Sequence, residues 1–380
     1  MKHGSYAVPV HELVAVALDG GSGFVEVLRR AWDAGDAVLP VDPRLAPPAR
    51  EQLVEKLCAG VLVDSTGQRH RLAGGEPVEP GDALVMATSG STGEPKGVVH
   101  THASIDASSR ATSSGLGVDP SHDRWLCCLP LAHVAGLSVV TRAMWAGIPF
   151  RILPAFDASA VEQAAREWGA TLTTVVPTAL SRFDASLFRR IVVGGAAPPA
   201  DLPSNCVVSY GLTETGSAVA YDGRALPDVE LRIVDGEIQV RGPMLLRAYR
   251  DGGDPKDAEG WFSTRDAGSW GPQGELIVHG RADDVIITGG ENVWPVTVER
   301  VLAGHPGVAE VTVIGRPDEE WGHRVVAIVV PTDARVPPSL DELRAIVRAQ
   351  LHPFAAPREL DLVAELPRTS LGKVQRHHLT

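Results

Sequence analysis

Cysteine, aromatic residues and long apolar runs are all scarce in this 380-residue chain. Its four cysteines, Cys58, Cys127, Cys128 and Cys206, form no Cys-x-x-Cys pair, which argues against a zinc site or a disulfide framework and favours reduced, buried thiols. No stretch approaches the roughly 18 apolar residues that a membrane span needs, and the N-terminus makes a poor secretory signal. We therefore expect a cytoplasmic protein without membrane insertion.

Cations are also in deficit, since 35 Lys and Arg face 47 Asp and Glu, giving a net charge of -12. This balance argues against a broad surface for nucleic acid or anionic lipid, although it leaves room for a local basic pocket that binds a phosphate. The content of 44% hydrophobic and 22% charged residues is that of an ordinary globular enzyme. A chain of this length exceeds one compact core, so we expect two domains.

Helical and strand patterns alternate along most of the chain, which indicates an α/β fold. Helices are expected at 51–58, 158–168, 295–303 and 340–351, the last after a capping box formed by Ser339 and Glu342. Strands are expected at 61–63, 83–87, 171–176, 190–193, 275–279, 308–314 and 325–330. The pattern changes near residue 280, which predicts a small α+β domain at the C-terminus.

A segment rich in glycine and hydroxyl side chains, residues 88–97 (TSGSTGEPKG), directly follows the expected buried strand 83–87. Glycines let the backbone approach an anion, hydroxyls donate hydrogen bonds and a lysine adds a mobile cation, so the chemistry is that of a phosphate cradle. The spacing matches neither the P-loop nor the dinucleotide fingerprint, and a flexible surface turn is the competing interpretation. The candidate residues are Thr88, Ser89, Gly90, Ser91, Thr92, Gly93 and Lys96.

Five further segments place a few chemically active side chains among glycines. They are residues 129–136 (LPLAHVAG), 209–216 (SYGLTETG), 260–268 (GWFSTRDAG), 280–290 (GRADDVIITGG) and 367–376 (PRTSLGKVQR). Each has an ordinary explanation when taken alone: His133 as a core histidine, Asp266 as a turn former and Lys373 as a solvated charge near the C-terminus. Their order along the chain carries more information than any one of them.

In that order, the segments from about residue 83 to residue 376 resemble the motifs of the adenylate-forming superfamily, which comprises acyl-CoA synthetases, firefly luciferases and peptide-synthetase adenylation domains. The resemblance is weakest at the N-terminus, which is longer in most relatives. It implies a large N-terminal domain of sheets layered with helices, residues 1–282, and a small α+β C-terminal lid domain, residues 283–380. It also implies ATP, Mg²⁺ and CoA as cofactors and a small carboxylic acid as substrate, with a homodimer possible by analogy.

The resemblance assigns roles to single residues as well. The phosphate loop, Gly195, Ala196, Gly211, Asp266 and Arg281 would bind ATP, with Tyr210 stacked on adenine and Asp266 on the ribose hydroxyls. Thr213 would touch the phosphate, Glu214 would ligate Mg²⁺, His133 would stand beside the acyl pocket and Lys373 would be the catalytic lysine of adenylation. In the family, one half-reaction forms the acyl-adenylate from ATP and the second transfers the acyl group to a thiol, and the lid rotates between them. Asp283 matches the hinge of this rotation, and Gly289 and Gly290 would line the path of the CoA arm.

The acid is indicated by two stretches. Residues 130–147 resemble the o-succinylbenzoate:CoA ligases of menaquinone biosynthesis, and residues 210–215 with 220–229 resemble their compact actinobacterial form. That substrate has two carboxylates, so Arg142 is a candidate cation for the second one, and a solvated charge on a helix face is the competing interpretation. The same residues would also suit another aryl- or acyl-CoA ligase, a stand-alone carrier-loading adenylation enzyme or a non-catalytic adenine-nucleotide sensor.

Overall fold

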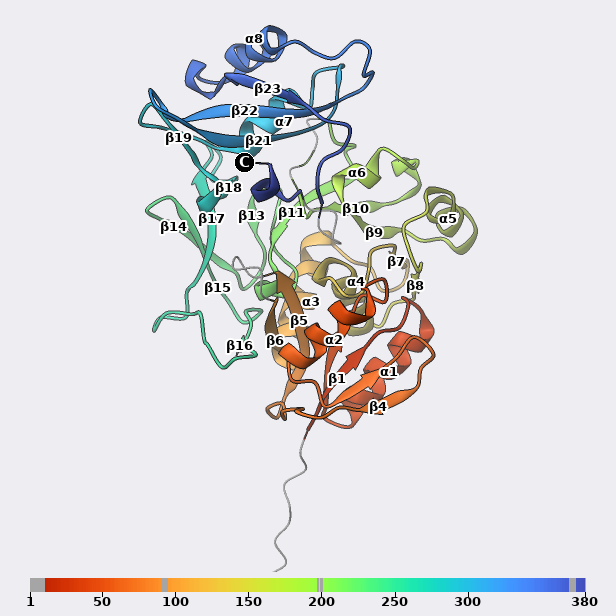
Figure 1. Ribbon diagram of the computed structural model, residues 1–380. Coiled ribbons are helices and arrows are strands. Elements are labelled where there is room, and N and C mark those ends of the chain that lie inside the picture. The colour runs from red at the N-terminus through yellow and green to blue at the C-terminus, as the bar shows by residue number, and fades with distance from the viewer. Residues whose placement is uncertain (1–10, 90–94, 197, 199–200, 369–373, 380) are drawn as a thin grey trace, which may run out of the picture. The chain divides into compact units, whose positions relative to one another are not determined.

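The computed structural model describes residues 11–89, 95–196, 198, 201–368 and 374–379 (Figure 1). The chain divides into two compact units. The first comprises Met1–Pro198, Pro203–Leu231 and Val240–Ser263, and the second comprises Pro199–Leu202, Arg232–Gln239 and Thr264–Thr380. The expected boundary between residues 282 and 283 lies inside the second unit. It was expected as a hinge, which the division into compact units does not test, so it stays a prediction.

The first seven-stranded sheet of the first unit has the order β16-β6-β5-β2-β1-β3-β4. Its central strands β1, β2, β3 and β5 run parallel, while β4, β6 and β16 pair antiparallel. The central strands are short apolar runs buried on both faces, as in parallel sheets covered by helices. The strands are β1 (Leu13–Val16), β2 (Ala37–Pro40), β3 (Val61–Val63), β4 (Arg69–Arg71), β5 (Asp82–Ser89), β6 (Pro95–Thr101) and β16 (Ala248–Tyr249).

The second seven-stranded sheet has the order β13-β12-β11-β10-β9-β7-β8. Strands β7 to β11 are parallel neighbours, and β12 and β13 extend the sheet antiparallel. The carboxyl ends of β9, β10 and β11 therefore meet at one edge. The strands are β7 (Trp125–Cys127), β8 (Phe150–Ile152), β9 (Leu172–Val175), β10 (Arg190–Val193), β11 (Cys206–Gly211), β12 (Ala218–Tyr221) and β13 (Arg224–Ala225).

Helices α3 and α4 pack against each other, and most of their residues are buried. α3 begins at a capping box between Thr101 and Ser104. Both helices end at a left-handed glycine, Gly117 and Gly147, which closes the last turn. The helices of the first unit are α1 (Ser22–Asp33), α2 (Pro47–Lys56), α3 (His102–Leu116), α4 (Val134–Ala146), α5 (Ala158–Gln163) and α6 (Pro177–Leu180).

Two of the expected helices differ from the structure by more than one residue in their limits. The helix expected at 51–58 begins at Pro47, because proline suits the first turn, where its missing N–H is not needed. The helix expected at 158–168 is α5 followed by a π-helical turn, Ala164–Trp168, that ends at left-handed Gly169. No helix in the described ranges is both long and apolar enough to cross a membrane.

A four-stranded sheet has the order β14-β15-β17-β18, and a five-stranded sheet has the order β20-β19-β22-β21 with β23 also beside β22. The strands of the four-stranded sheet are β14 (Glu230–Val234), β15 (Glu237–Arg241), β17 (Phe262–Trp270) and β18 (Leu276–Arg281). Those of the five-stranded sheet are β19 (Ile286–Thr288), β20 (Glu291–Val293), β21 (Val308–Asp318), β22 (Gly322–Pro331) and β23 (Glu359–Leu362). The five-stranded sheet lies in the blue part of Figure 1 with α7 (Pro295–Leu302) and α8 (Leu340–Gln350).

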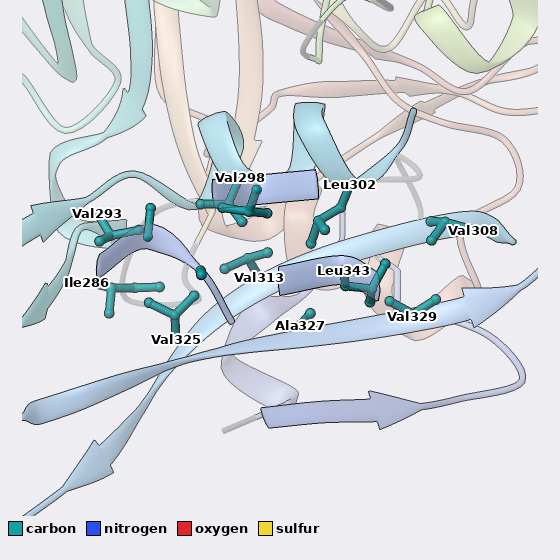
Figure 2. Close-up of a cluster of buried hydrophobic side chains, with 13 residues drawn as sticks. Ile286, Val293, Val298, Leu302, Val308, Val313, Val325, Ala327, Val329 and Leu343 are labelled. Atoms are coloured by element: carbon teal, nitrogen blue, oxygen red, sulfur yellow. The ribbon is translucent and has the colours of Figure 1, made fainter. Parts of the chain in front are cut away.

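Strand β22 alternates between two apolar clusters. Val325, Ala327 and Val329 pack with residues of α7 and α8, as Figure 2 shows, whereas Val326 and Ile328 face a cluster that includes Val374. This period of two buries both faces of the sheet. The predicted capping box is confirmed, because the Ser339 hydroxyl accepts the Glu342 N–H and the Glu342 carboxylate accepts the Ser339 N–H.

Candidate active site

The predicted phosphate loop, residues 88–97, begins at the end of β5 and ends at the start of β6, two antiparallel strands in which Thr88 lies opposite Lys96. Thr88 is half-buried and Lys96 is exposed. The Lys96 ammonium lies 5.2 Å from the centre of the Tyr249 ring, a cation–π contact. Gly90, Ser91, Thr92, Gly93 and the side chain of Ser89 lie outside the described residues. The flanking strands thus place Thr88 and Lys96 side by side where the loop begins and ends.

Glu214 lies in a short 3-10 turn, η3 (Thr213–Thr215), which ends at left-handed Gly216. Its carboxylate accepts a hydrogen bond of 3.1 Å from the Tyr249 hydroxyl, and its backbone carbonyl accepts the Leu246 N–H at 2.8 Å. Tyr249 therefore touches both the predicted metal ligand and the predicted phosphate cation. A half-buried carboxylate held by one hydroxyl keeps oxygen lone pairs for a further ligand.

A buried histidine holds the other side of the η3 turn. His100 Nε2 lies 2.7 Å from the Thr213 carbonyl oxygen, and because a carbonyl only accepts, Nε2 carries the proton. Its Nδ1 lies 3.3 Å from the Ser104 hydroxyl. Burial lowers the pKa of His100 to about 4, and the bond to Thr213 offsets this only in part. His100 is therefore a neutral donor at ordinary pH and fixes the backbone of Thr213.

The predicted adenine-binding residues follow two adjacent parallel strands, β10 and β11. Open α/β sheets bind ligands outside such carboxyl ends. Gly195, with φ +83°, and exposed Ala196 follow β10, and Tyr210 and Gly211 end β11. A side chain at Gly211 would place its Cβ 2.2 Å from the Ser217 carbonyl oxygen, so the turn into η3 requires glycine.

His133 is the residue that precedes α4, and it makes no side-chain capping bond there. It lies near Asp42, whose carboxyl pKa is lowered first by hydrogen bonding to Arg44 and further by the charge of His133. Asp42, Arg44 and Leu131 line one pocket of the first unit. The role of His133 beside an acyl group stays a prediction.

Arg142 is buried, with 2% of its surface exposed, so the interpretation as a solvated helix-face charge is wrong. Its Nη2 donates to the hydroxyls of Ser138 and Ser217 at 3.0 and 3.1 Å, and its guanidinium lies 4.8 Å from the centre of the Trp125 ring. Burial lowers its pKa, which Tyr221 partly opposes. Ser138, whose hydroxyl accepts from Arg142, also lines a small cavity beside His100 and Met86.

In the second unit, the structure brings the predicted ribose-binding pair together. Asp266 on β17 is paired with Arg281 on β18, and the Arg281 Nη1 lies 3.3 Å from the Asp266 carboxylate and donates to the Thr264 carbonyl at 3.1 Å. Arg265, between Thr264 and Asp266 in the chain, has φ +59°, an uncommon value for a residue with a side chain. The Glu237 carboxylate accepts the Arg265 N–H at 2.8 Å and so holds this kink.

The predicted hinge and CoA residues lie close in sequence in the same unit. Asp283 is in a 3-10 turn, η4 (Ala282–Asp284). Gly289 and Gly290 join β19 to β20 with φ of +59° and +83°, the values of a two-residue hairpin turn. A Cβ on Gly289 would also lie 2.8 Å from the Trp321 ring, whereas Gly290 faces open space. The turn therefore requires both glycines without any ligand.

Lys373 lies outside the described residues. The residues that flank its segment are placed: Arg368 and Val374 form an antiparallel bridge, and the Gln375 N–H donates to the Pro367 carbonyl at 2.8 Å. In the described part of the chain, no group of three or more His, Cys, Asp or Glu side chains is arranged to hold a metal ion. All four cysteines are free; Cys127 and Cys128 are buried, as expected, whereas Cys58 and Cys206 are only half-buried.

Sequence reasoning missed His100 and Tyr249. His100 falls within the stretch that follows the phosphate loop, but nothing in its local pattern shows that it will reach Thr213, 113 residues later. Tyr249 lies 35 residues after Glu214 in a segment without a motif. His100 lies on β6 and Tyr249 on β16, strands that pair in the sheet that also contains β5. Only knowledge of this strand pairing could have predicted both residues.

Two family models match the chain. One, described as AMP-binding enzyme, covers residues 65–250, and the other, described as AMP-binding enzyme C-terminal domain, covers residues 297–373. The first range contains the phosphate loop and Glu214, and the second ends at Lys373. With the relatives described next, these matches show that the chain belongs to the family of AMP-binding, adenylate-forming enzymes.

Individual proteins similar to this chain include CoA ligases that act on aromatic acids. A "Probable 2-succinylbenzoate--CoA ligase" from Mycobacterium tuberculosis is 38% identical over 331 residues, which cover 80% of this chain and 85% of that protein. An indoleacetate–CoA ligase from Aromatoleum aromaticum is 36% identical over 338 residues, which cover 77% and 66%. The o-succinylbenzoate CoA synthetase from Bacillus subtilis, solved with its acyl-adenylate intermediate, superposes with a TM-score of 0.86 at 27% identity, covering 98% of this chain and 89% of that one. The predicted family and α/β fold class are confirmed.

Proposed function

We propose that this enzyme joins 2-succinylbenzoate to CoA through an acyl-adenylate, as a step in menaquinone biosynthesis. The acid is the one that the similar ligase from Mycobacterium tuberculosis and the synthetase from Bacillus subtilis carry in their names. The observation in this chain that carries the proposal is the buried guanidinium of Arg142, which donates to Ser138 in the lining of a small cavity. A buried cation is costly unless it is paired, and a second carboxylate on the substrate supplies the missing charge.

The first half-reaction forms the adenylate. A carboxylate oxygen of the acid attacks the α-phosphorus of ATP, a new P–O bond forms and the bond to pyrophosphate breaks. Negative charge gathers on the phosphate oxygens, so catalysis consists mainly of positioning and electrostatic stabilisation. In this proposal Lys373, Lys96 and the hydroxyls of the phosphate loop stabilise that charge.

In this proposal, the nucleotide is bound by the residues that the sequence motifs predict. Tyr210 stacks on adenine next to Gly195 and Ala196, and Thr213 donates to a phosphate from the turn that His100 fixes. Asp266 accepts hydrogen bonds from the ribose hydroxyls, and the ion pair with Arg281 orients its carboxylate.

Glu214 is the residue that would hold Mg²⁺. Magnesium usually takes one or two protein carboxylates together with substrate phosphates and water, so one half-buried carboxylate fits a metal that arrives with ATP. The Tyr249 hydroxyl orients that carboxylate. The ion would neutralise phosphate charge during adenylation.

The second half-reaction transfers the acyl group. The CoA thiolate attacks the acyl carbon, a C–S bond forms and AMP leaves with the former carboxylate oxygen. We propose that the chain pivots at Asp283 between the two half-reactions, so that Lys373 leaves the site and the Gly289–Gly290 turn comes to line the path of the CoA arm.

A second candidate acid is an arylacetate, because the indoleacetate–CoA ligase is almost as similar in sequence. The two candidates differ in the number of carboxylates, and only the diacid makes use of Arg142. Two further functions would use the same nucleotide site: loading of a carrier-protein thiol in place of CoA, and sensing of a nucleotide without turnover.

The proposal is tested by measuring pyrophosphate release with ATP, Mg²⁺ and a panel of acids, with and without CoA. The panel contains 2-succinylbenzoate, indoleacetate, benzoate, medium-chain fatty acids and amino acids. We expect a strong preference for 2-succinylbenzoate and CoA-dependent turnover. Preference for a monoacid refutes the substrate, and absence of release with every acid favours the sensor. Lys373→Ala serves as the control, since it should bind ATP but lose fast adenylation.

A further inference from the structure

One arginine fastens the last residues of the chain to the rest of the second unit. Arg376 begins the short turn η6 (Arg376–His378). Its Nη1 donates to the Asp284 carboxylate at 2.7 Å, and its Nη2 lies 2.9 Å from both carboxylate oxygens of Glu299. Its Nε donates to the Thr312 hydroxyl at 3.3 Å. Every nitrogen of the guanidinium therefore has a directed partner.

The charge of this arginine is secure although its surroundings are largely buried. Burial lowers the pKa of Arg376, but Glu299 and Asp284 together outweigh it and leave the pKa raised. Charge-assisted bonds of this kind are about twice as strong as neutral ones and, with two carboxylates, fix the plane of the guanidinium.

Each partner belongs to a different element. Asp284 lies in η4, next to the proposed pivot Asp283, while Glu299 lies on α7 and Thr312 on β21. Glu299 is itself held, because its Oε1 also accepts the Thr312 hydroxyl at 2.9 Å and the Val313 N–H at 2.8 Å. The Glu299 carboxylate is thus held by β21 as well as by Arg376.

Arg376 follows Lys373 by three residues, a separation that limits their Cα atoms to about 11 Å. The two residues that flank positions 369–373 are held as well. Val374 pairs with Arg368 and packs in the apolar cluster of Ile314 and Val326. Arg376, three residues after the proposed catalytic lysine, is therefore anchored to the turn that carries the proposed pivot.

We propose that Arg376 is a positioning residue for adenylation: it ties the described residues that follow Lys373 to the η4 turn through Asp284 and Glu299, and adenylation by Lys373 depends on this tie. This inference rests on the proposed function. It adds that the lysine depends on a remote ion-pair cluster, in which Arg376 itself touches no substrate.

A purely structural role is separated from this one by a matched control. Arg316 lies on β21 in the same unit, with 24% of its side chain exposed against 28% for Arg376, and it also pairs with two carboxylates, Glu359 and Asp361. Those partners lie on β23, away from η4 and from Lys373 in the chain. Arg316→Gln should therefore cost a similar amount of stability without disturbing the lysine.

The test measures both half-reactions separately in the full-length wild-type enzyme and in R376Q, R376K and R316Q. Adenylation is followed in single turnovers as pyrophosphate release from ATP, Mg²⁺ and 2-succinylbenzoate without CoA. Thioester formation is followed from synthetic 2-succinylbenzoyl-adenylate and CoA. We expect R376Q to slow adenylation about 30- to 100-fold, as a misplacement of about 1 Å does, and to change thioester formation by less than about threefold. R376K should be intermediate, and R316Q should stay within about threefold of wild type in both.

Equal losses in both half-reactions for R376Q, or the same pattern in R316Q, would overturn the proposal. If the wild type activates a different acid, only the substrate assignment fails, and the same comparison is made with that acid and its adenylate. Hydrogen exchange gives a readout that needs no turnover: R376Q should lose protection at residues 282–286 as well as 374–379. Loss confined to 374–379 would refute the link to the hinge turn.

Discussion

Replacing Tyr249 with phenylalanine removes one hydroxyl and leaves the ring that contacts Lys96. The hydroxyl lies 3.1 Å from the Glu214 carboxylate. A hydrogen bond to a charged group contributes about 1.5–3 kcal/mol, and we take the lower end because both side chains are only half-buried. That corresponds to roughly a tenfold loss in affinity for a ligand that depends on the orientation of this carboxylate.

The assay is the rate of adenylate formation at a fixed ATP concentration as free Mg²⁺ is varied. For Tyr249→Phe we expect the half-saturating Mg²⁺ concentration to rise about tenfold, with the rate at saturating Mg²⁺ changed by less than about threefold. Glu214→Gln should raise the requirement further, because it removes the charge as well as its orientation. An unchanged Mg²⁺ requirement in Tyr249→Phe would refute Glu214 as a ligand oriented by Tyr249.

Three other predictions follow from single contacts. Burial holds the pKa of His100 at about 4, against 6.5 in the unfolded chain, so as the pH falls the unfolded state binds a proton on this ring before the folded state does. The free energy of unfolding should therefore fall by about 3 kcal/mol between pH 6.5 and 4. Urea unfolding should show that fall in the wild type and a shallower one in His100→Gln. Gly289→Ala should lose about 2 kcal/mol or more in the same measurement and Gly290→Ala only about 1, because the first adds a clash with Trp321 to the left-handed strain; equal losses would contradict this. Arg142→Gln should lower kcat/KM for 2-succinylbenzoate about 10- to 100-fold more than for benzoate, and a uniform loss would show that the arginine only supports the core.

Many helices and strands could be predicted from local sequence patterns. The capping box at Ser339 and the strand Arg190–Val193 were predicted because cap chemistry and β-branched runs act within a few residues. The Gly289–Gly290 pair was also recognised, but for a ligand path, whereas its positive φ values and the Trp321 ring already account for both glycines. A glycine pair alone does not tell a functional approach from a turn.

Contacts between distant segments were beyond local patterns. Arg376 meets Asp284 across 92 residues, and Tyr249 meets Glu214 across 35, in each case because sheet pairing and packing bring unrelated segments together. Arg142 shows the same limit. A charged residue on a helix is ordinarily solvated, and only the burial of α4 between packed elements turns it into an interior cation.

The central claim is that 2-succinylbenzoate is activated as an adenylate before it meets CoA. The most direct measurement is mass spectrometry of the small molecules after a single turnover with enzyme in excess over acid. With ATP and Mg²⁺ alone, we expect 2-succinylbenzoyl-adenylate and an equal amount of pyrophosphate. Addition of CoA should then convert the adenylate to the thioester with release of AMP. Thioester formation accompanied by ADP and phosphate, or no adenylate from this acid while a monoacid gives one, would contradict the claim.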